Sequence, residues 1–278
     1  MDIRLLQEVT RNIETALKED EVFRDLTTLS CLAKPEQGIA TLLLKEEATV
    51  AGLPFLPMIA YAVDPEVKVT LLKEEGSYVP GGTPLANLTG PLSSLLSMER
   101  TLLNFLQHTT SIATEVARFV KAAEGKCAIL DTRKTLPCHR FLQKYAVAQG
   151  GGENHRFHLA DQILIKDNHL SFISIQEAIQ KSREKYPLKT IQVEVEDLNM
   201  FREALEAHPD AILLDNMSLS DIRTAVSQNT KGIYLEASGG IDLQNIRSYA
   251  ETGVDGISVG KLTHSIRGID MSLEIRRK

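Results

Sequence analysis

Several features that would indicate a specialised class of protein are scarce in this chain. Its 278 residues contain no tryptophan and only three cysteines, Cys31, Cys127 and Cys138, which stand far apart. That spacing predicts neither a disulfide framework nor a zinc site, and it fits a reducing compartment. No apolar run approaches the roughly 20 residues that a membrane span requires. The sequence therefore predicts a cytoplasmic protein with no membrane partner.

Positive charge is also in short supply overall. The chain has 31 Lys and Arg against 37 Asp and Glu, a formal net charge of −6. Binding to nucleic acid requires a basic face, so no nucleic-acid partner is predicted. The first residues mix charges with leucine and isoleucine at helical spacing, and no uninterrupted apolar segment is present, so a secretory signal is not expected there.

The pattern of apolar residues predicts two different regions. Residues 3–19 have the spacing of an amphipathic helix, and residues 38–52 and 67–90 alternate like strands between Gly and Pro turns. Pro91 precedes a long stretch without Gly or Pro, which predicts a helix with a break near Thr109. We interpret residues 1–108 as an N-terminal α+β domain.

After residue 126, short apolar runs alternate with amphipathic helices. The runs are residues 127–132, 161–167, 190–196, 211–216, 232–240 and 256–260. The last four have centres about 20 to 23 residues apart, the length of a strand, a helix and two turns. This repeat predicts an α/β domain over residues 109–265, with the tail 266–278 packing on the first domain. About 150 residues is short for a full eight-stranded barrel of roughly 250, so an incomplete, open TIM-like barrel is expected.

Charged or small residues stand at the end of each predicted strand. A single one would be an ordinary solvated loop residue, but six runs in succession end in this way. Parallel strands present their carboxyl ends on one side, where active sites of such barrels lie. The residues that this argument brings together are Arg133, Lys134, Lys166, Glu196, Asp215, Ser238, Gly239, Gly240 and Gly260.

Cations gather in one part of this otherwise acidic chain. Residues 131–169 contain only four acidic side chains, against the basic residues Arg133, Lys134, His139, Arg140, Lys144, His155, Arg156, His158, Lys166 and His169. Like charges placed together repel, so the cluster requires a counter-charge. A bound polyanion with carboxylates or phosphates is predicted, because arginine and lysine suit both groups.

Carboxylates and a glycine-rich turn complete the predicted site. Glu196 and Asp215 stand among cations, where they are suited to hold Mg²⁺, to bind sugar hydroxyls, or both. The turn from Ser238 to Gly240, with a helix expected from Leu243, offers backbone N–H groups to a phosphate. Together with Gly260 and His264, these residues predict a site for a sugar phosphate beside a divalent metal.

These motifs resemble those of the quinolinate phosphoribosyltransferase family, also called nicotinate-nucleotide pyrophosphorylase (carboxylating). The resemblance spans nearly the whole chain in order, beginning with Met98–Thr101. It continues through Asp131–Thr135, Gly150–Gly152, Asn154–Arg156, Leu164–His169, Glu194–Glu196, Leu213–Asn216, Glu236–Gly240 and Ser258–Gly260.

The resemblance implies a pentosyltransferase that acts in NAD biosynthesis. Quinolinate would attack C1 of phosphoribosyl pyrophosphate through its ring nitrogen. Pyrophosphate would leave, the 2-carboxylate would be lost as CO₂, and nicotinate mononucleotide would remain. Mg²⁺ is the implied cofactor. The implied assembly is a homodimer with active sites shared between its subunits, and assembly beyond the dimer is left open.

The resemblance also implies a role for each predicted site residue. The quinolinate carboxylates would be held by Arg133, His155, Arg156 and Lys166, with Arg100 from the other subunit. The ribose hydroxyls and Mg²⁺ would be held by Glu196 and Asp215, and Lys134 would lie near the pyrophosphate. The 5′-phosphate would be surrounded by Ser238, Gly239, Gly240, Gly260 and His264. Direct catalytic roles would belong to Lys134, Lys166, Glu196 and Asp215.

Three departures from the family pattern concern loops. Pro137 is followed by Cys138-His139-Arg140 where the family usually has Gly-Leu-Arg. Ala148 stands where arginine is frequent, and residues 19–25 lack two glycines of the family's early acidic motif. The sequence shows no residue paired with Cys138 that would activate its thiol, so we interpret Cys138 as a non-catalytic cysteine.

Other functions remain open on the residues alone. A paralogous family found beside molybdate transport has a similar barrel, although Arg100 and the His155-Arg156 pair favour quinolinate. A metal-dependent hydrolase would use His155, His158, His169 and Asp215. A non-catalytic nucleotide sensor would keep the pocket without turnover, which the retained acidic and cationic sets disfavour.

Overall fold

The computed structural model describes residues 3–32 and 34–278. The chain divides into two compact units. Unit 1 comprises Met1–Ala117, Thr135–Gly151 and Ser265–Lys278, and unit 2 comprises Arg118–Lys134 and Gly152–His264. These units do not follow the expected division after residue 108, because residues 135–151 group with the N-terminal part. The predicted domain boundary between residues 108 and 109 remains a prediction.

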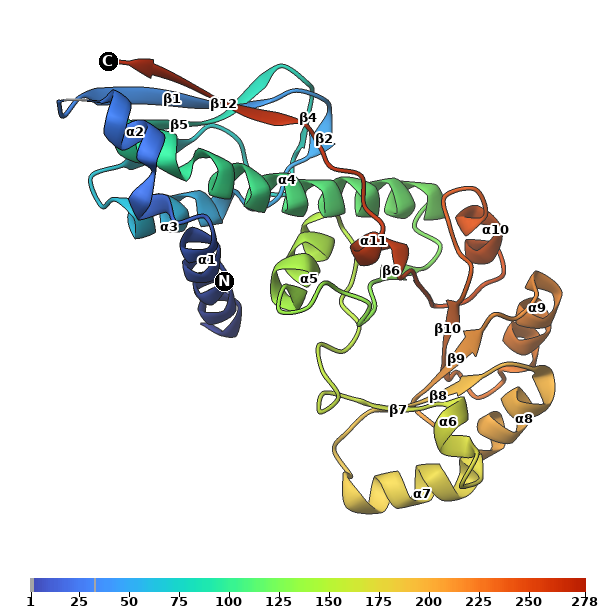
Figure 1. The fold of residues 1–278 in the computed structure, drawn as a ribbon. Coiled ribbons are helices and arrows are strands. Elements are labelled where there is room, and N and C mark those ends of the chain that lie inside the picture. Colours follow the sequence, from blue (N-terminus) through green and yellow to red (C-terminus); the bar gives the residue numbers. More distant parts are fainter. Residues whose placement is uncertain (1–2, 33) are drawn as a thin grey trace. The chain divides into compact units, whose positions relative to one another are not determined.

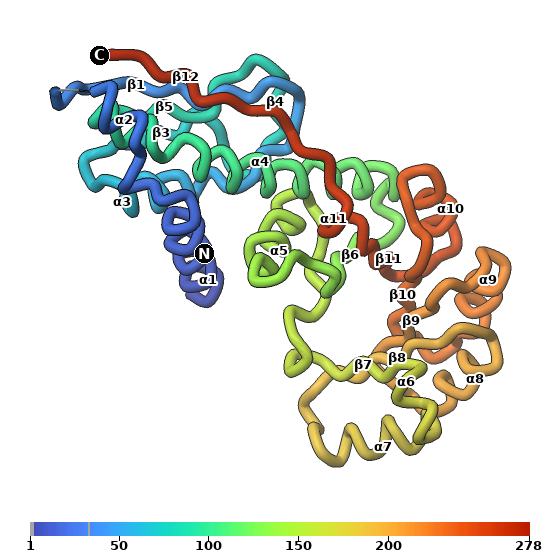
Figure 2. The backbone as a smooth tube through the Cα atoms, in the orientation of Figure 1, coloured from blue at the N-terminus to red at the C-terminus, as the bar shows by residue number. Residues whose placement is uncertain are grey.

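Unit 1 contains a four-stranded antiparallel sheet in the order β12-β1-β5-β3. Its strands are β1 (Gln37–Leu44), β3 (Lys68–Leu71), β5 (Thr83–Pro91) and β12 (Met271–Arg277). Figure 1 labels β1, β5 and β12, and Figure 2 also labels β3. The C-terminal strand β12 pairs along β1 from Gly38 to Leu44, and Figure 2 shows the two running side by side. Short strands β2 (Ala48–Thr49) and β4 (Tyr78–Val79) pair separately. Alternate residues of β1 are buried, as expected for one covered face.

Helices cover the core of unit 1. They are α1 (Ile3–Glu19), α2 (Leu26–Cys31), α3 (Leu56–Val63), α5 (Arg140–Gln149) and the first part of α4 (Leu92–Ala123), with 3₁₀ turns η1 (Val22–Arg24) and η2 (Leu53–Phe55). The helix predicted at residues 3–19 is confirmed. The break predicted near Thr109 is wrong, because α4 is continuous. The Thr109 hydroxyl donates to the Phe105 carbonyl of its own helix (2.9 Å) and contacts the Ala51 carbonyl (2.6 Å), so it is satisfied without interrupting the helix.

Unit 2 contains a six-stranded parallel sheet in the order β6-β11-β10-β9-β8-β7. The strands are β6 (Ala128–Leu130), β7 (Ile163–Ile165), β8 (Ile191–Val195), β9 (Ala211–Asp215), β10 (Tyr234–Ser238) and β11 (Gly256–Ser258), each within a predicted apolar run. Strands β8 and β11 are buried along their whole length, as parallel strands covered on both faces are. The first two strands, β6 and β7, form opposite edges of the sheet. The expected open TIM-like barrel is confirmed.

Helices connect the strands of unit 2. They are α6 (Asp167–Leu170), α7 (Ile175–Lys185), α8 (Leu198–Ala207), α9 (Leu219–Gln228), α10 (Ile246–Ala250) and α11 (Lys261–His264). The helix expected from Leu243 begins later, at Ile246. The Asp242 carboxylate accepts the backbone N–H groups of Gln244 and Asn245, a local turn that competes with helix at this point. None of the helices within residues 3–32 and 34–278 is both long and apolar enough to cross a bilayer.

Candidate active site

A cavity of about 390 Å³ lies at the carboxyl ends of the strands of unit 2. Five basic side chains line it: Arg133, Lys134, His155, Arg156 and Lys166. Three acidic side chains, Glu194, Asp215 and Glu236, and the hydroxyl residues Thr132, Ser238 and Ser258 also line it. Seven of the predicted site residues thus meet in one cavity, and we name it the charged cavity.

The register of the sheet explains how acidic and hydroxyl groups come together. Asp215 and Ser258 each pair with Ser238 across neighbouring parallel strands, so the three lie in one row. One row deeper, Glu194 and Glu236 each pair with Leu213. Residues two apart on a strand point to the same face, so both rows face the charged cavity.

Glu194 lines the charged cavity, whereas Glu196 does not. Glu194 lies within β8, is 8 % exposed, and forms an ion pair with Lys166 Nζ. Glu196 follows the strand in an exposed bend. The sequence contains a relevant signal, because Glu194 alternates with Val193 and Val195 inside a predicted strand, and a charged residue in such a strand is rarely buried without a function or a partner.

The arginines of the charged cavity are incompletely compensated. Arg156 Nη1 donates to the Gln162 carbonyl at 2.9 Å. Burial lowers the pKa of the Arg156 guanidinium and nearby Arg133 lowers it further, while Asp161 and Glu194 act in the opposite direction. Arg133 Nε is buried without a hydrogen-bond partner among the described residues. The lowered pKa of Arg156 and the unpaired Nε of Arg133 both indicate positive charge that a bound anion would stabilise.

Lys134, Gly260 and His264 are neighbours. The Lys134 carbonyl accepts the Thr263 hydroxyl at 2.6 Å, which ties together the segments after β6 and β11. A Cβ atom on Gly260 would lie 3.1 Å from Lys134 Cδ and 3.2 Å from His264 Nε2. A side chain at position 260 would therefore displace one of these two basic residues. Gly260 and His264 do not themselves line the charged cavity.

The turn after β10 depends on glycine. Gly239 has φ of 98° and Gly240 has φ of 62°, both in the left-handed region that L side chains rarely adopt. The Asn216 side chain occupies the place of a Cβ on Gly239, and the Asn216 N–H donates to the Ser238 carbonyl at 2.9 Å. Helix α10 has only five residues. Anion binding here would therefore use the N–H groups of the turn itself.

Comparison with known proteins decides the family. The model of the quinolinate phosphoribosyl transferase C-terminal domain matches residues 112–274, and the model of the N-terminal domain matches residues 25–110. The chain belongs to the quinolinate phosphoribosyltransferase family.

Relatives match over their whole lengths. The chain is 39 % identical over 277 residues to a probable nicotinate-nucleotide pyrophosphorylase [carboxylating] of Methanocaldococcus jannaschii, covering 95 % of this chain and 96 % of that one. It is 38 % identical over 272 residues to the nicotinate-nucleotide pyrophosphorylase [carboxylating] of Mycobacterium leprae, covering 95 % of each. The solved structure of the nicotinate-nucleotide pyrophosphorylase from Francisella tularensis is similar with a TM-score of 0.92 and 38 % identity, over 97 % of this chain and 96 % of that one.

Only some of the cations of residues 131–169 line the charged cavity. Arg140 and Lys144 belong to α5 in unit 1, and Lys144 is fully buried there. Cys138 also belongs to unit 1, away from the lining of the charged cavity. Arg100 is exposed and lies on the portion of α4 that belongs to unit 1. Local density of charge along the chain therefore overstated how many cations share one place.

The histidines do not form a metal centre. His158 Nε2 pairs with Asp161 at 2.9 Å, and His169 Nδ1 accepts the backbone N–H of Lys166 at 3.0 Å. Within the described ranges, no three His, Cys, Asp or Glu side chains are grouped to hold a metal ion. The hydrolase alternative, which needs such a group, gains no support from this arrangement.

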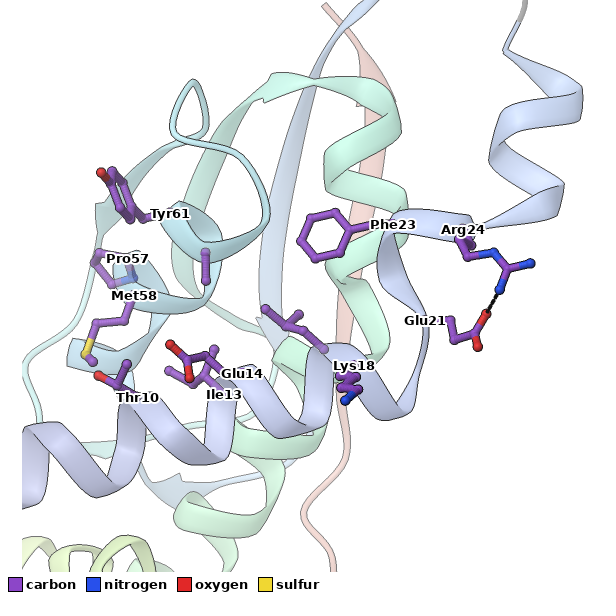
Figure 3. Close-up of a pocket in the computed structure, with 12 residues that line it drawn as sticks. Thr10, Ile13, Glu14, Lys18, Glu21, Phe23, Arg24, Pro57, Met58 and Tyr61 are labelled. Carbon is purple, nitrogen blue, oxygen red and sulfur yellow. Dashed lines mark hydrogen bonds and ion pairs between the residues drawn. The ribbon is translucent and has the colours of Figure 1, made fainter.

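A larger cavity lies in unit 1 and has different chemistry. It measures about 1060 Å³ and lies between α1, η1 and α3. Figure 3 shows Thr10, Ile13 and Glu14 of α1 facing Pro57 and Met58. Most of its lining is apolar, and among its charged residues Glu21 is paired to Arg24 at 3.1 Å. It lacks the convergent cations and carboxylates of the charged cavity, so we assign no chemistry to it.

Proposed function

We propose that the chain transfers the phosphoribosyl group of phosphoribosyl pyrophosphate to quinolinate, with loss of CO₂. The products are nicotinate mononucleotide and pyrophosphate, and the reaction serves NAD biosynthesis in the cytoplasm. The observation that supports this is the charged cavity, which joins five basic side chains with carboxylates and hydroxyls at the carboxyl ends of a parallel sheet. Membership of the family supports the same reaction.

Quinolinate binds through its two adjacent carboxylates. The guanidinium forks of Arg133 and Arg156 suit carboxylates, Lys166 adds a point charge, and His155 lies beside them. These contacts hold the ring nitrogen towards C1 of the ribose. Departure of pyrophosphate leaves an oxocarbenium-like centre, so the protein contributes mainly positioning and electrostatic stabilisation.

The phosphoribosyl part binds along the ends of the later strands. The ribose hydroxyls are held by Asp215 and by one of two glutamates, Glu194 in β8 or Glu196 directly after it. Glu194 is favoured for this role because it is buried and lines the charged cavity. The 5′-phosphate is received by Ser238, Gly239, Gly240, Gly260 and His264. Lys134, tied to Thr263 through its carbonyl, lies beside the pyrophosphate.

The donor set fits Mg²⁺ delivered with the substrate. Mg²⁺ keeps several waters and is commonly held by one or two carboxylates plus substrate phosphates, with no all-protein cage. Asp215 lines the charged cavity at a strand end, and Glu194 and Glu196 stand on the neighbouring strand or just after it. When bound, the metal would neutralise charge on the pyrophosphate. Asp215 then serves both the ribose hydroxyls and that metal.

Decarboxylation needs little from the protein. Once ribosylated, the ring nitrogen is cationic and stabilises the carbanion that forms at the adjacent C2. No dedicated acid is required for this step. The C2 carbanion then takes up a proton from water or from Lys166 Nζ, which is paired with Glu194 and lines the same cavity.

A substrate comparison tests the proposed function. Incubation with quinolinate, phosphoribosyl pyrophosphate and Mg²⁺ should yield nicotinate mononucleotide and CO₂. Nicotinate, with one carboxylate fewer, leaves buried cations unpaired and should lose on the order of 3 to 5 kcal/mol of transition-state stabilisation. Comparable turnover of the two acids would refute the assignment.

We further propose a homodimer in which Arg100 enters the partner's active site. Its place in unit 1, exposed and outside the lining of the charged cavity, supports this. Arg100→Ala and Lys134→Ala proteins should each be nearly inactive. Mixed dimers would contain one site with both defects and one with neither, so remixed subunits should recover about a quarter of wild-type activity by random pairing. Thorough subunit exchange without recovery would place Arg100 within its own chain's site or outside catalysis.

A further inference from the structure

Three polar side chains form a hydrogen-bonded chain beside the charged cavity. Glu236 on β10 is 2 % exposed and Gln192 on β8 is 1 % exposed. Gln192 Nε2 donates to Glu236 Oε2 at 2.9 Å, and Gln192 Oε1 lies 3.1 Å from His155 Nε2. Glu236 and His155 line the cavity, whereas Gln192 does not. A side chain outside the lining therefore connects two that belong to it.

The donors and acceptors determine the state of each member. A carboxylate only accepts, so Gln192 turns its NH₂ group to Glu236 and its oxygen to His155. The other ring nitrogen, His155 Nδ1, accepts the backbone N–H of Arg156 at 2.7 Å. Because Nδ1 is an acceptor, the proton of the neutral ring lies on Nε2, and Gln192 Oε1 accepts it. Both ring nitrogens are thus engaged within the protein.

We propose that Gln192 and Glu236 are positioning residues, which hold His155 as the Nε2–H tautomer and set its ring beside Arg156. His155 then contributes shape to the quinolinate site, while Arg133, Arg156 and Lys166 contribute charge. Maintaining the chain is costly, because Glu236 Oε1 is buried without a hydrogen-bond partner in the part of the chain that the structure describes. A polar group retained at such a cost is expected at a functional site.

Three substitutions separate orientation from charge. Gln192→Met keeps the length of the side chain and removes both hydrogen-bonding groups. Glu236→Leu removes the acceptor that orients Gln192, whereas Glu236→Gln keeps one acceptor oxygen, replaces the other oxygen with an NH₂ group and removes the charge that lies 3.6 Å from His155 Nε2. Gln162→Met is the matched control, because Gln162 Nε2 also donates to Gln192 Oε1, at the longer distance of 3.3 Å.

Long-range ¹⁵N–¹H correlation spectra of the free protein measure the tautomer directly. The His155 signals are assigned by their loss in His155→Asn. The wild type, E236Q and Q162M should show the Nε2–H tautomer, and Q192M and E236L should lose it. Q192M and E236L both test whether the Nε2–H tautomer is lost. If one of the two variants does not fold, the other still decides the question. A wild-type His155 protonated on Nδ1, or an unchanged tautomer in both Q192M and E236L, would overturn the inference.

The kinetic consequence rests on the proposed function. In Q192M and E236L the KM for quinolinate should rise on the order of tenfold while kcat changes less than about twofold, because ground-state positioning is lost. E236Q, which keeps an acceptor for Gln192, should raise this KM less than E236L does, and impairment as large as that of E236L would assign the role to charge and refute positioning. A wild type that does not turn over quinolinate would refute the proposed function, and the spectra would still decide the tautomer.

Discussion

The two units use their sheets in opposite ways. In unit 1, β1 and β5 bury only glycine and apolar residues, such as Leu42, Leu44 and Leu88, and the sheet forms part of one apolar core. In unit 2, strands β8 and β10 bury Gln192, Glu194 and Glu236 among apolar neighbours. Burying polar groups destabilises a fold unless they are paired, so their concentration in one sheet identifies the sheet that serves function.

The cavities of the two units differ in the same way. The larger one, about 1060 Å³, is mainly apolar and lies in unit 1, whereas the charged cavity of about 390 Å³ lies in unit 2. Size therefore does not identify the active site here. The decisive property is convergence of cations and carboxylates from several strand ends.

The largest expected effect tests which glutamate of unit 2 serves the reaction. Glu194→Gln should lower kcat/KM for phosphoribosyl pyrophosphate on the order of a hundredfold, because a buried charge beside the reaction is lost and Lys166 is left without its partner. Glu196→Gln is the matched control and should change kcat/KM less than about threefold. Steady-state kinetics of both variants decides, and a more damaging Glu196→Gln would restore the role implied by the family resemblance.

A second effect concerns a titratable group of unit 1 that plays no part in the proposed chemistry. Burial lowers the pKa of His108 from 6.5 to about 4, with His139 acting in the same direction. Because the folded-state pKa is lowered, this contribution to stability is present above pH 6.5 and is lost as pH falls towards 4. The free energy of unfolding should therefore decrease by about 2 kcal/mol between pH 7 and pH 5 from this residue.

Urea denaturation at several pH values measures that contribution. His108→Gln should unfold with a shallower pH dependence between pH 7 and pH 5 than the wild type. If the free energy of unfolding of His108→Gln depends on pH as steeply as that of the wild type, the argument from the burial of His108 is contradicted.

The smallest expected effect is on the free energy of unfolding and concerns a loop of unit 1. Cys138 has φ of 63°, a left-handed conformation that costs energy for a residue with a Cβ atom. Cys138→Gly should raise the free energy of unfolding by about 0.5 to 1 kcal/mol, after the greater flexibility of glycine in the unfolded chain is deducted. Cys138→Ala removes the thiol and keeps the Cβ, so thermal unfolding should show no gain. A gain in the alanine variant would assign the effect to the thiol.

Part of the site was predictable because its signals are local. Arg133, Lys134, Lys166, Asp215 and Ser238 all stand at strand ends, and the period of the apolar runs marks those ends along the chain. Parallel strands then bring their ends together by geometry alone. The open sheet followed from the same period and from the short length of the region.

The rest depended on directions in space that a linear pattern does not contain. Glu194 and not Glu196 lines the cavity because of where β8 ends. The role of Gln192 depends on Glu236 of β10 and on His155 of the segment between α5 and β7. The sequence also does not show that residues 131–169 are divided between the units: α5 belongs to unit 1, whereas Arg133, Lys134, Arg156 and Lys166 belong to unit 2.

The sequence by itself determined the strands, the order of the cations and the family, since each rests on residue type and spacing along the chain. The tertiary structure decided which charges share a cavity, which ring nitrogen of His155 carries a proton, and that the larger of the two cavities described is not the charged one. The physical reason is that burial and hydrogen bonding join residues far apart in the chain, and both are settled only when the strands are in register.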